Sequence, residues 1–206
     1  MLITFEGIDG CGKSTQIALL VSYFKEQGKE VYLFREPGGN PLSEKIRNLL
    51  LDSKESVHPM TELLLFSAAR AQLVFNNIRP LLERKKIVLL DRFYDSTIAY
   101  QGFGRKVSDI EHLRNINVLA TGGLIPDITF YLNVPLAVAA ERRQHLGEGD
   151  RMERSGEAFY ERVLEGYEML SKTEKRFFSI DASGTAQQTF DIIIQILKEN
   201  ERKGTG

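Results

Sequence analysis

Apolar residues recur along this chain with two alternating spacings. Short runs rich in β-branched and aromatic residues predict strands, which lie at 2–8, 31–36, 87–91, 127–133 and 177–182. Between them, apolar residues recur every three or four positions, which predicts helices at 13–28, 42–51, 60–84, 95–101, 108–121, 135–144, 157–171 and 185–200. Because strands and helices alternate, the pattern predicts an α/β fold with a parallel five-stranded sheet flanked by helices on both faces.

Turn and capping residues agree with these boundaries. Gly28 is a natural stop for the first helix. His58 and Pro59 start the long helix, whose acidic first turn and basic last turn suit the helix dipole. The stretch HLGEGDRMERSG at 145–156 is polar, charged and glycine-bearing, so we expect a mobile flap there. With the arginines before it, this flap defines a small lid segment at approximately 142–156.

Length and composition limit the possible partners. The 206 residues suit a single domain, 1–206, and 42% of them are apolar. The formal net charge of −1 gives no overall attraction to nucleic acids or to anionic membranes, so we expect neither as a partner. One cysteine, Cys11, excludes an intrachain disulfide and is compatible with a reducing cytosol. The N-terminus has no basic signal-peptide region, and we expect a cytoplasmic protein.

The clearest chemical signal lies between the first strand and the first helix. The stretch FEGIDGCGKSTQ, 5–16, has the spacing GxxxxGKS of a phosphate-binding loop. Backbone N–H groups and the helix N-terminus bind phosphate there, Lys13 neutralises the β- and γ-oxygens, and the Ser14 hydroxyl suits Mg²⁺. We therefore predict an ATP site at Gly7, Ile8, Asp9, Gly10, Cys11, Gly12, Lys13, Ser14 and Thr15.

Charged residues also follow the second and third predicted strands. Asp91 ends the run IVLLD, where a carboxylate near the metal is expected, although capping the next helix is its simpler role. Arg35 and Arg92 follow their strands on either side of the phosphate loop, which predicts an anion clamp. A clamp for a second anion favours a small-molecule kinase over a nucleotide-hydrolysing switch, and the chain has no NKxD-like guanine-recognition string.

Several motifs together resemble the thymidylate kinases of bacteria, over essentially the whole chain. They are FEGIDGCGKSTQ (5–16), REPGG (35–39), DRFYDSTIAYQG (91–102), PDITFYLNVP (126–135), FYERVLEGY (159–167) and the arginine-bearing flap (142–154). The resemblance implies the P-loop nucleoside monophosphate kinase fold and the phosphorylation of dTMP to dTDP by ATP with Mg²⁺, on the route to dTTP. It also implies a homodimer, for which the helices near 60–84 would supply an interface.

The resemblance implies roles in holding the sugar and phosphate of the acceptor. Asp9 would contact the deoxyribose 3′-hydroxyl, and a cis peptide would precede Pro37. Arg35 and Arg92 would hold the acceptor phosphate, with Arg47 as a weaker candidate whose simpler role is on a solvated helix face.

A second group of residues would form the thymine pocket. Phe66 would stack on the base, and Arg70, four residues later on the same helix face, would donate a hydrogen bond to carbonyl O4. Tyr100 would pack under the sugar and crowd out a 2′-hydroxyl. Core packing is the simpler role of both aromatic residues. The remaining polar contacts to the base would come from Ser96, Thr97 and Gln101.

The transition state needs a further cation, because none of the four variable loop positions is basic. The resemblance locates this cation in the flap, with Arg151 as first choice and Arg143 and Arg154 next; a solvated charged loop is the alternative. Arg142 would lie against adenine, near Ala182 and Ser183. The predicted catalytic residues are thus Asp9, Lys13, Arg92, Arg143 and Arg151, and the predicted metal ligands are Ser14 and Asp91.

Two other functions stay open from the sequence. Another nucleoside monophosphate kinase on the same fold would differ in its acceptor base, and the Phe66 and Arg70 pair with Gln101 argues against it. A P-loop ATPase without a small acceptor would turn over ATP alone. A phosphate acceptor needs no strong general base, and His58, His112 and His145 lie outside the motifs.

Overall fold

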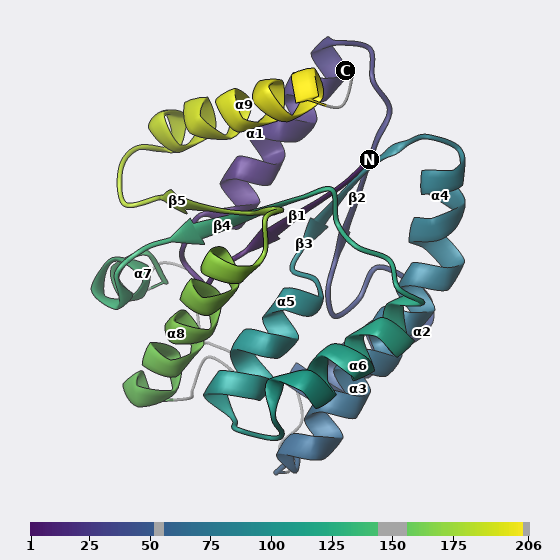
Figure 1. The fold of residues 1–206 in the computed structure, drawn as a ribbon, viewed down its shortest axis with the longest axis vertical. Coiled ribbons are helices and arrows are strands. Elements are labelled where there is room, and N and C mark those ends of the chain that lie inside the picture. The colour runs from purple at the N-terminus through teal and green to yellow at the C-terminus, as the bar shows by residue number, and fades with distance from the viewer. Residues whose placement is uncertain (52–55, 144–155, 204–206) are drawn as a thin grey trace.

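Five parallel strands form the centre of the molecule (Figure 1). They are β1 Leu2–Glu6, β2 Val31–Arg35, β3 Ile87–Asp91, β4 Ile128–Asn133 and β5 Phe177–Asp181. Their order across the sheet is β2-β3-β1-β4-β5, and every neighbouring pair is parallel. This computed structural model describes residues 1–51, 56–143 and 156–203. The parallel five-stranded α/β fold expected from the apolar pattern is confirmed.

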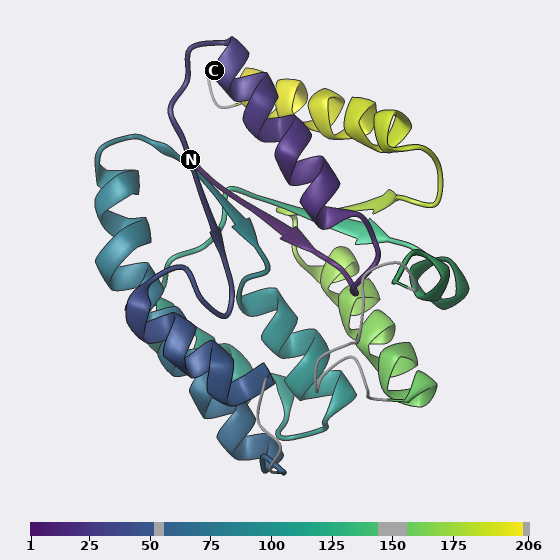
Figure 2. The same cartoon turned by 180° about the vertical axis from the view of Figure 1, so that it is seen from behind.

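Helices cover both faces of this sheet. On one face, α1 Lys13–Glu26 lies beside α9 Ala186–Lys203 (Figure 2). The opposite face carries α3 Pro59–Leu73, α4 Arg79–Glu83, α5 Tyr94–Ser96, α6 Ile110–Thr121 and α8 Glu157–Thr173. The helix α2 Pro41–Leu51 packs against α3, and α7 Leu136–Arg143 follows β4 at the strands' carboxyl ends.

Alternate residues of the central strands serve the two faces. Leu2 of β1 and Val88 of β3 are buried in a cluster with Leu73 of α3. Their neighbours Ile3 and Leu89 point to the other face and are buried in a cluster that includes α1. A strand in the middle of a sheet covered on both sides is apolar at most positions, and this is the reason that β1 and β3 are rich in apolar residues.

Two segments predicted as ordinary α-helix contain wider π-helical turns. The predicted helix 60–84 consists of α3, the π-helical η1 Val74–Ile78 and α4. Pro80 in α4 lacks an amide donor and crowds the carbonyl four residues earlier, and the wide turn before it accommodates this ring. The predicted helix 95–101 consists of α5 and the π-helical η2 Thr97–Gly104. Apolar spacing does not distinguish the two helix types.

The carboxyl ends of the strands meet at one edge of the sheet, as they do in other parallel α/β sheets. The loop after β1 turns sharply, because Gly7, Gly10 and Gly12 have φ of 137°, 85° and 101°. A Cβ atom at Gly7 would lie 2.7 Å from the Leu132 carbonyl oxygen, so only glycine fits there. The peptide bond between Glu36 and Pro37 is cis, as the resemblance implied.

None of the helices in the described part of the chain is long and apolar enough to cross a membrane.

Candidate active site

Three adjoining clefts lie along the carboxyl ends of β1, β2, β3 and β5. The phosphate cleft follows the loop after β1 and is lined by Asp9, Gly10, Gly12, Lys13, Ser14, Thr15, Arg35, Glu36, Arg47, Asp91, Arg92 and Arg142. The acceptor cleft is lined by Asp9, Glu36, Pro37, Arg47, Leu51, Phe66, Arg70, Arg92, Phe93, Ser96, Thr97, Tyr100 and Gln101. The outer cleft is lined by Cys11, Gly12, Thr15, Gln16, Arg142, Ala182, Gly184, Ala186 and Thr189.

Shared walls join the clefts in one row. Asp9 and Arg92 line both the phosphate cleft and the acceptor cleft. Arg142 and Thr15 line both the phosphate cleft and the outer cleft. The residues predicted for the acceptor therefore gather at one end, apart from Arg35, which lines the phosphate cleft.

The phosphate loop is folded around the side chain of Lys13. Its ammonium group donates hydrogen bonds to the carbonyl oxygens of Gly7 at 3.1 Å and Ile8 at 3.2 Å. It also lies 3.8 Å from a carboxylate oxygen of Asp9. Ser14 is exposed in the first turn of α1, where the helix N-terminus favours anions. Loop and helix together offer a site for the phosphates of a nucleotide.

Asp91 offers a metal ligand beside this loop. Its Oδ1 atom is buried and has no hydrogen-bond partner in the described part of the chain. The next helix, α5, has Phe93 at its N-cap position and no side-chain cap, so Asp91 does not cap it. No group of three or more His, Cys, Asp or Glu side chains that could hold a metal occurs among the described residues. Mg²⁺ needs only one or two protein ligands, because water and substrate phosphate oxygens occupy the rest of its coordination shell.

Arg92 connects the phosphate cleft with the acceptor cleft. Its backbone φ of 67° is in the left-handed region, which turns the chain sharply after β3. The guanidinium donates to Asp9 at 2.7 Å and to the Gly7 carbonyl at 2.7 Å, and it lies 5.0 Å from the ring centre of Tyr100. Burial alone would raise the pKa of Asp9, but Arg92 and Lys13 outweigh it and hold this pKa well below its usual range.

Arg70 forms the deepest polar contacts of the acceptor cleft. Its Nε donates to the Glu36 carboxylate at 2.8 Å, and both side chains are buried. The other guanidinium nitrogens donate to Thr97 and Asn117 side chains and to the Phe93 carbonyl. Four of the five N–H groups of the guanidinium are thus used within the described structure, and one on Nη2 is left. Burial raises the pKa of Glu36, against the lowering effect of Arg70.

Comparison with known proteins identifies one family over most of the chain. Residues 5–193 match the family model described as thymidylate kinase. The chain belongs to the thymidylate kinase family. A thymidylate kinase of Chlorobium luteolum is 48% identical over 97% of this chain and 97% of its own length. The thymidylate kinase of Thermosipho africanus is 46% identical over 97% of this chain and 98% of its own length.

A solved structure agrees with both the fold and the family. The crystal structure of thymidylate kinase from Ehrlichia chaffeensis superposes with a TM-score of 0.79 at 37% identity. It covers 96% of this chain and 98% of that one. The chain is therefore an enzyme of the thymidylate kinase family, a transferase of phosphoryl groups with the P-loop nucleoside monophosphate kinase fold.

The base-facing and sugar-facing residues predicted from the family pattern line the acceptor cleft together. Phe66 is half-buried in α3, and Tyr100 and Gln101 are buried in η2. The Tyr100 hydroxyl is buried and has no partner among the described residues. Thr97 accepts a hydrogen bond from Arg70, and Ser96 lies 3.4 Å from the nearest guanidinium nitrogen of Arg92.

The predicted phosphate-binding arginines differ in their surroundings. Arg35 is exposed and pairs with Glu44 at 3.2 Å, so the clamp expected from Arg35 and Arg92 combines a surface residue with a part-buried one. Arg47 donates to the Pro37 carbonyl at 2.9 Å and lines both the phosphate cleft and the acceptor cleft.

The arginines expected at the lid divide into two groups. Arg151 and Arg154, with most of the lid at 142–156, lie outside the described residues. Arg143 ends α7, and its guanidinium lies 5.2 Å from the ring centre of Tyr160. Arg142 donates to the carbonyl oxygens of Ala182 at 3.0 Å and Ser183 at 3.2 Å. It thereby closes the outer cleft on the side of the loop after β5.

Sequence reasoning missed a buried carboxylate beneath the site. Glu6, the last residue of β1, accepts hydrogen bonds from the Phe93 amide at 2.8 Å, from Ser96 at 2.6 Å and from Tyr167 at 2.8 Å. Burial, and then the carboxylate of Asp95, raises the pKa of Glu6 to about 7. A charged residue at the end of an otherwise apolar run was the available signal.

Proposed function

We propose that the chain transfers the γ-phosphoryl group of ATP, bound with Mg²⁺, to the phosphate of dTMP and so forms dTDP. Family membership supports the reaction class and the acceptor. The observation that carries the assignment to these residues is the wall that Asp9 and Arg92 share between the phosphate cleft and the acceptor cleft. Two bound nucleotides would meet with their phosphates at this wall.

The acceptor phosphate is itself the nucleophile. The second pKa of a phosphate monoester is about 6, so the group is largely a dianion at neutral pH and needs no strong base. No histidine lines any of the three clefts in the described structure. His58 caps α3 and His112 pairs with Asp109, in keeping with their expected position outside the site.

Charge repulsion between the two phosphates is the main barrier that this site would lower. Lys13 supplies a cation in the phosphate cleft, and Arg92 and Arg47 line both clefts. Arg35 is exposed enough to swing toward a phosphate. Asp9 lies 2.7 Å from Arg92, which keeps this carboxylate ionised and able to accept from a sugar hydroxyl. Positioned cations of this kind stabilise the spreading charge of phosphoryl transfer.

Magnesium would be held by the Ser14 hydroxyl and the Asp91 carboxylate, directly or through water. The buried, unpartnered Oδ1 of Asp91 supports this assignment. When bound, the metal neutralises developing charge on the phosphate oxygens. Asp91 and Ser14 would hold it beside the loop that is proposed to bind the donor phosphates.

Arg143 is the described residue that best fits the additional cation. The Cβ position of Gly10 in the phosphate loop would lie 3.0 Å from Cγ of Arg143, so this side chain passes directly over the loop. Its Nε is buried and has no partner among the described residues. Arg151, the first choice from the family pattern, stays a prediction, as does Arg154. Arg142 would border adenine together with Ala182.

A homodimer is proposed for the face formed by α3 and α6, which lie side by side (Figure 1). Exposed apolar side chains gather on these helices and next to α6: Met60, Leu64, Val118, Leu119 and Ile125.

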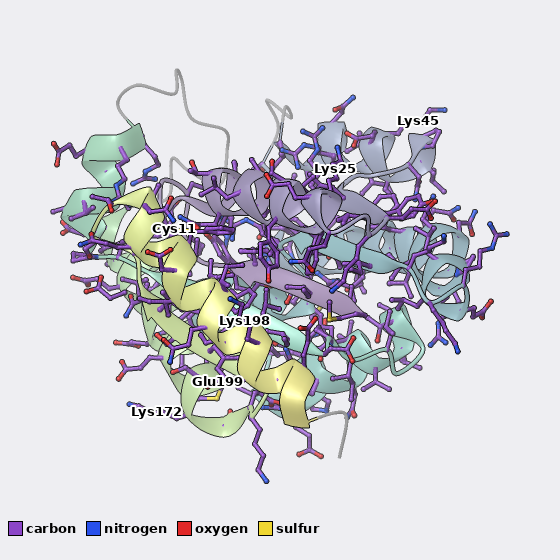
Figure 3. The ribbon with its side chains drawn as sticks, turned by 90° about the horizontal axis from the view of Figure 1, so that it is seen from above. Cys11, Lys25, Lys45, Lys172, Lys198 and Glu199 are labelled. Carbon is purple, nitrogen blue, oxygen red and sulfur yellow. The ribbon has the colours of Figure 1, made fainter. Side chains whose placement is uncertain are left out.

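Four exposed lysines lie on four different helices, with Lys25 on α1, Lys45 on α2, Lys172 on α8 and Lys198 on α9 (Figure 3). The expected absence of a nucleic-acid partner stays a prediction. The expected cytoplasmic location and single domain stay predictions.

The deciding experiment measures ADP release by purified protein with ATP and Mg²⁺. The acceptors are dTMP, dUMP, UMP, CMP, AMP, GMP and none. We expect release that depends on dTMP. Strong release with a purine monophosphate instead would indicate another monophosphate kinase. Equal release with every acceptor and without one would indicate an ATPase and refute the proposal.

A further inference from the structure

The amide side chain of Gln101 spans the space between a buried carboxylate and the acceptor cleft. Gln101 lies in η2, is 2% exposed and lines the cleft. Its Nε2 donates a hydrogen bond of 2.9 Å to Oε1 of Glu62. Glu62 lies in the first turn of α3 and is fully buried. The orientation of this amide decides whether an acceptor or a donor faces the bound base.

A second donor confirms that the Glu62 oxygen acts as an acceptor. Nε of Arg105 lies 3.4 Å from the same Oε1 atom. A guanidinium group donates hydrogen bonds and accepts none, so the oxygen that it meets must accept. The Arg105 side chain is itself positioned over the ring of Phe159, 4.5 Å from the ring centre. The amide end of Gln101 that faces Glu62 is therefore its NH₂ group.

The carbonyl end of the same amide is left for a ligand. In the described structure Oε1 of Gln101 has no hydrogen-bond partner, and it is not among the fully buried side-chain atoms that lack one. It therefore keeps some accessible surface. Because Gln101 lines the acceptor cleft and is otherwise buried, this surface opens into the cleft.

Arg70 presents the complementary group in the same wall. One N–H of its Nη2 is unused, whereas the other four N–H groups bind Glu36, Thr97, Asn117 and Phe93. Arg70 and Gln101 thus offer one donor and one acceptor. The edge of thymine or uracil has a C4 carbonyl that accepts and an N3–H that donates. Cytosine has the reverse arrangement, with a donating amino group and an accepting N3.

We propose that Glu62 is a positioning residue that fixes the amide of Gln101 with its oxygen toward the cleft and thereby selects 4-oxo over 4-amino pyrimidines. This role rests on the proposed function, because it concerns the acceptor of that reaction. Turning the amide round would direct its oxygen at a carboxylate that already accepts from Arg105, leaving two buried acceptors face to face. Glu62 itself does not touch the base.

The test compares kcat/KM for dTMP, dUMP and dCMP in the wild type and in Glu62→Gln. This substitution removes the charge that attracts Arg105, whose Nε lies 3.4 Å from Oε1 of residue 62. When Arg105 turns aside, residue 62 can donate from its NH₂ group, so the amide of Gln101 gains its second orientation. We expect the ratio of kcat/KM for dTMP to that for dCMP to fall about tenfold, the factor that corresponds to one net hydrogen bond. Some preference for dTMP over dCMP will remain, because the spare N–H of Arg70 would still face the amino group of cytosine, and both groups are donors.

Two further variants make the result decisive. Glu62→Asp withdraws the carboxylate by one methylene group, and we expect a similar fall in the ratio, so this variant decides the matter if Glu62→Gln does not fold. The exchange Glu62→Gln/Gln101→Glu restores a donor–acceptor pair with an acceptor facing the cleft, and we expect the ratio to recover. A merely structural role would lower kcat/KM for dTMP and dCMP by the same factor in every variant, which would overturn the proposal. Failure of the wild type to use dTMP would instead refute the proposed function.

Discussion

Replacing Glu6 by glutamine is expected to change how the stability of the protein depends on pH. The Glu6 carboxyl is buried at the end of β1 and accepts from the Phe93 amide and from the hydroxyls of Ser96 and Tyr167. Burial, reinforced by Asp95, raises its pKa from 4.5 to about 7. Glutamine has the same shape, keeps an oxygen for Phe93 and offers an NH₂ to the two hydroxyls, so it resembles the protonated carboxyl.

The direction of the effect follows from proton uptake. Between pH 4.5 and 7 the folded chain holds a proton on Glu6 that the unfolded chain has lost. The free energy of unfolding therefore falls as pH rises through this window, and the full loss is present above about pH 7. A pKa difference of this size corresponds to about 3 kcal/mol. In Glu6→Gln this loss is absent, so the variant gains stability relative to the wild type as pH rises.

Urea unfolding followed by circular dichroism at pH 5, 6, 7 and 8 measures this difference. The three histidines of the chain also titrate in this range, but they are common to both proteins and cancel in the comparison. Glu165→Gln, which alters an exposed residue of α8, is the matched control and should follow the wild type. Parallel curves for the wild type and Glu6→Gln would refute the reasoning, because they would mean that Glu6 binds no extra proton in the folded state.

Four further predictions concern the clefts and the α3/α6 face. Arg70→Ala leaves the Glu36 carboxylate buried and unpaired, so we expect urea titration to give a free energy of unfolding lower by about 3 to 5 kcal/mol; an unchanged value would contradict the buried pair. In Asp91→Asn the Mg²⁺ concentration for half-maximal activity should rise at least tenfold, with KM for dTMP unchanged. Arg143→Gln should lower kcat by at least about tenfold and leave KM for dTMP unchanged. A change in KM alone would show that Arg143 binds substrate and does not stabilise the transition state. Leu119→Glu, at 79% exposure, should convert a dimer to a monomer in light scattering without loss of secondary structure; a monomeric wild type would refute the dimer.

The elements and the class of fold follow from local patterns in the sequence. The run of apolar residues in β1, the glycine spacing after it and the helical pattern of α1 are all contiguous, so each is visible without knowledge of the rest of the chain. The strand order β2-β3-β1-β4-β5 is not visible in this way, because it depends on which buried runs pair across crossovers. The π-helical turns of η1 and η2 are equally hidden, since segments of five and eight residues are too short for apolar spacing to separate π-helix from α-helix.

The residues that line the site were more predictable from the sequence than the side chains with which they form hydrogen bonds and ion pairs. Arg70 was expected to meet the base, and it lines the acceptor cleft. Its ion pair with Glu36, 34 positions away in the chain, has no local signal. The same holds for Glu62, which looks like an acidic residue suited to the first turn of a helix and is in fact buried against Gln101. Sequence motifs identify residue types at strand ends, whereas these partnerships arise from packing between elements.

These ion pairs determine how strongly, and in which orientation, the site binds an anion. Arg92 meets Asp9, Arg70 meets Glu36, and Arg35 meets Glu44. A cleft of unpaired arginines would bind any phosphate, but guanidinium groups already held by carboxylates offer only the N–H groups that remain. The carboxylates therefore reduce the attraction for anions in general and fix the directions of the remaining donors. Such a site discriminates by where its few spare donors and acceptors point, and this makes the orientation of Arg70 and Gln101 a question of specificity as well as of structure.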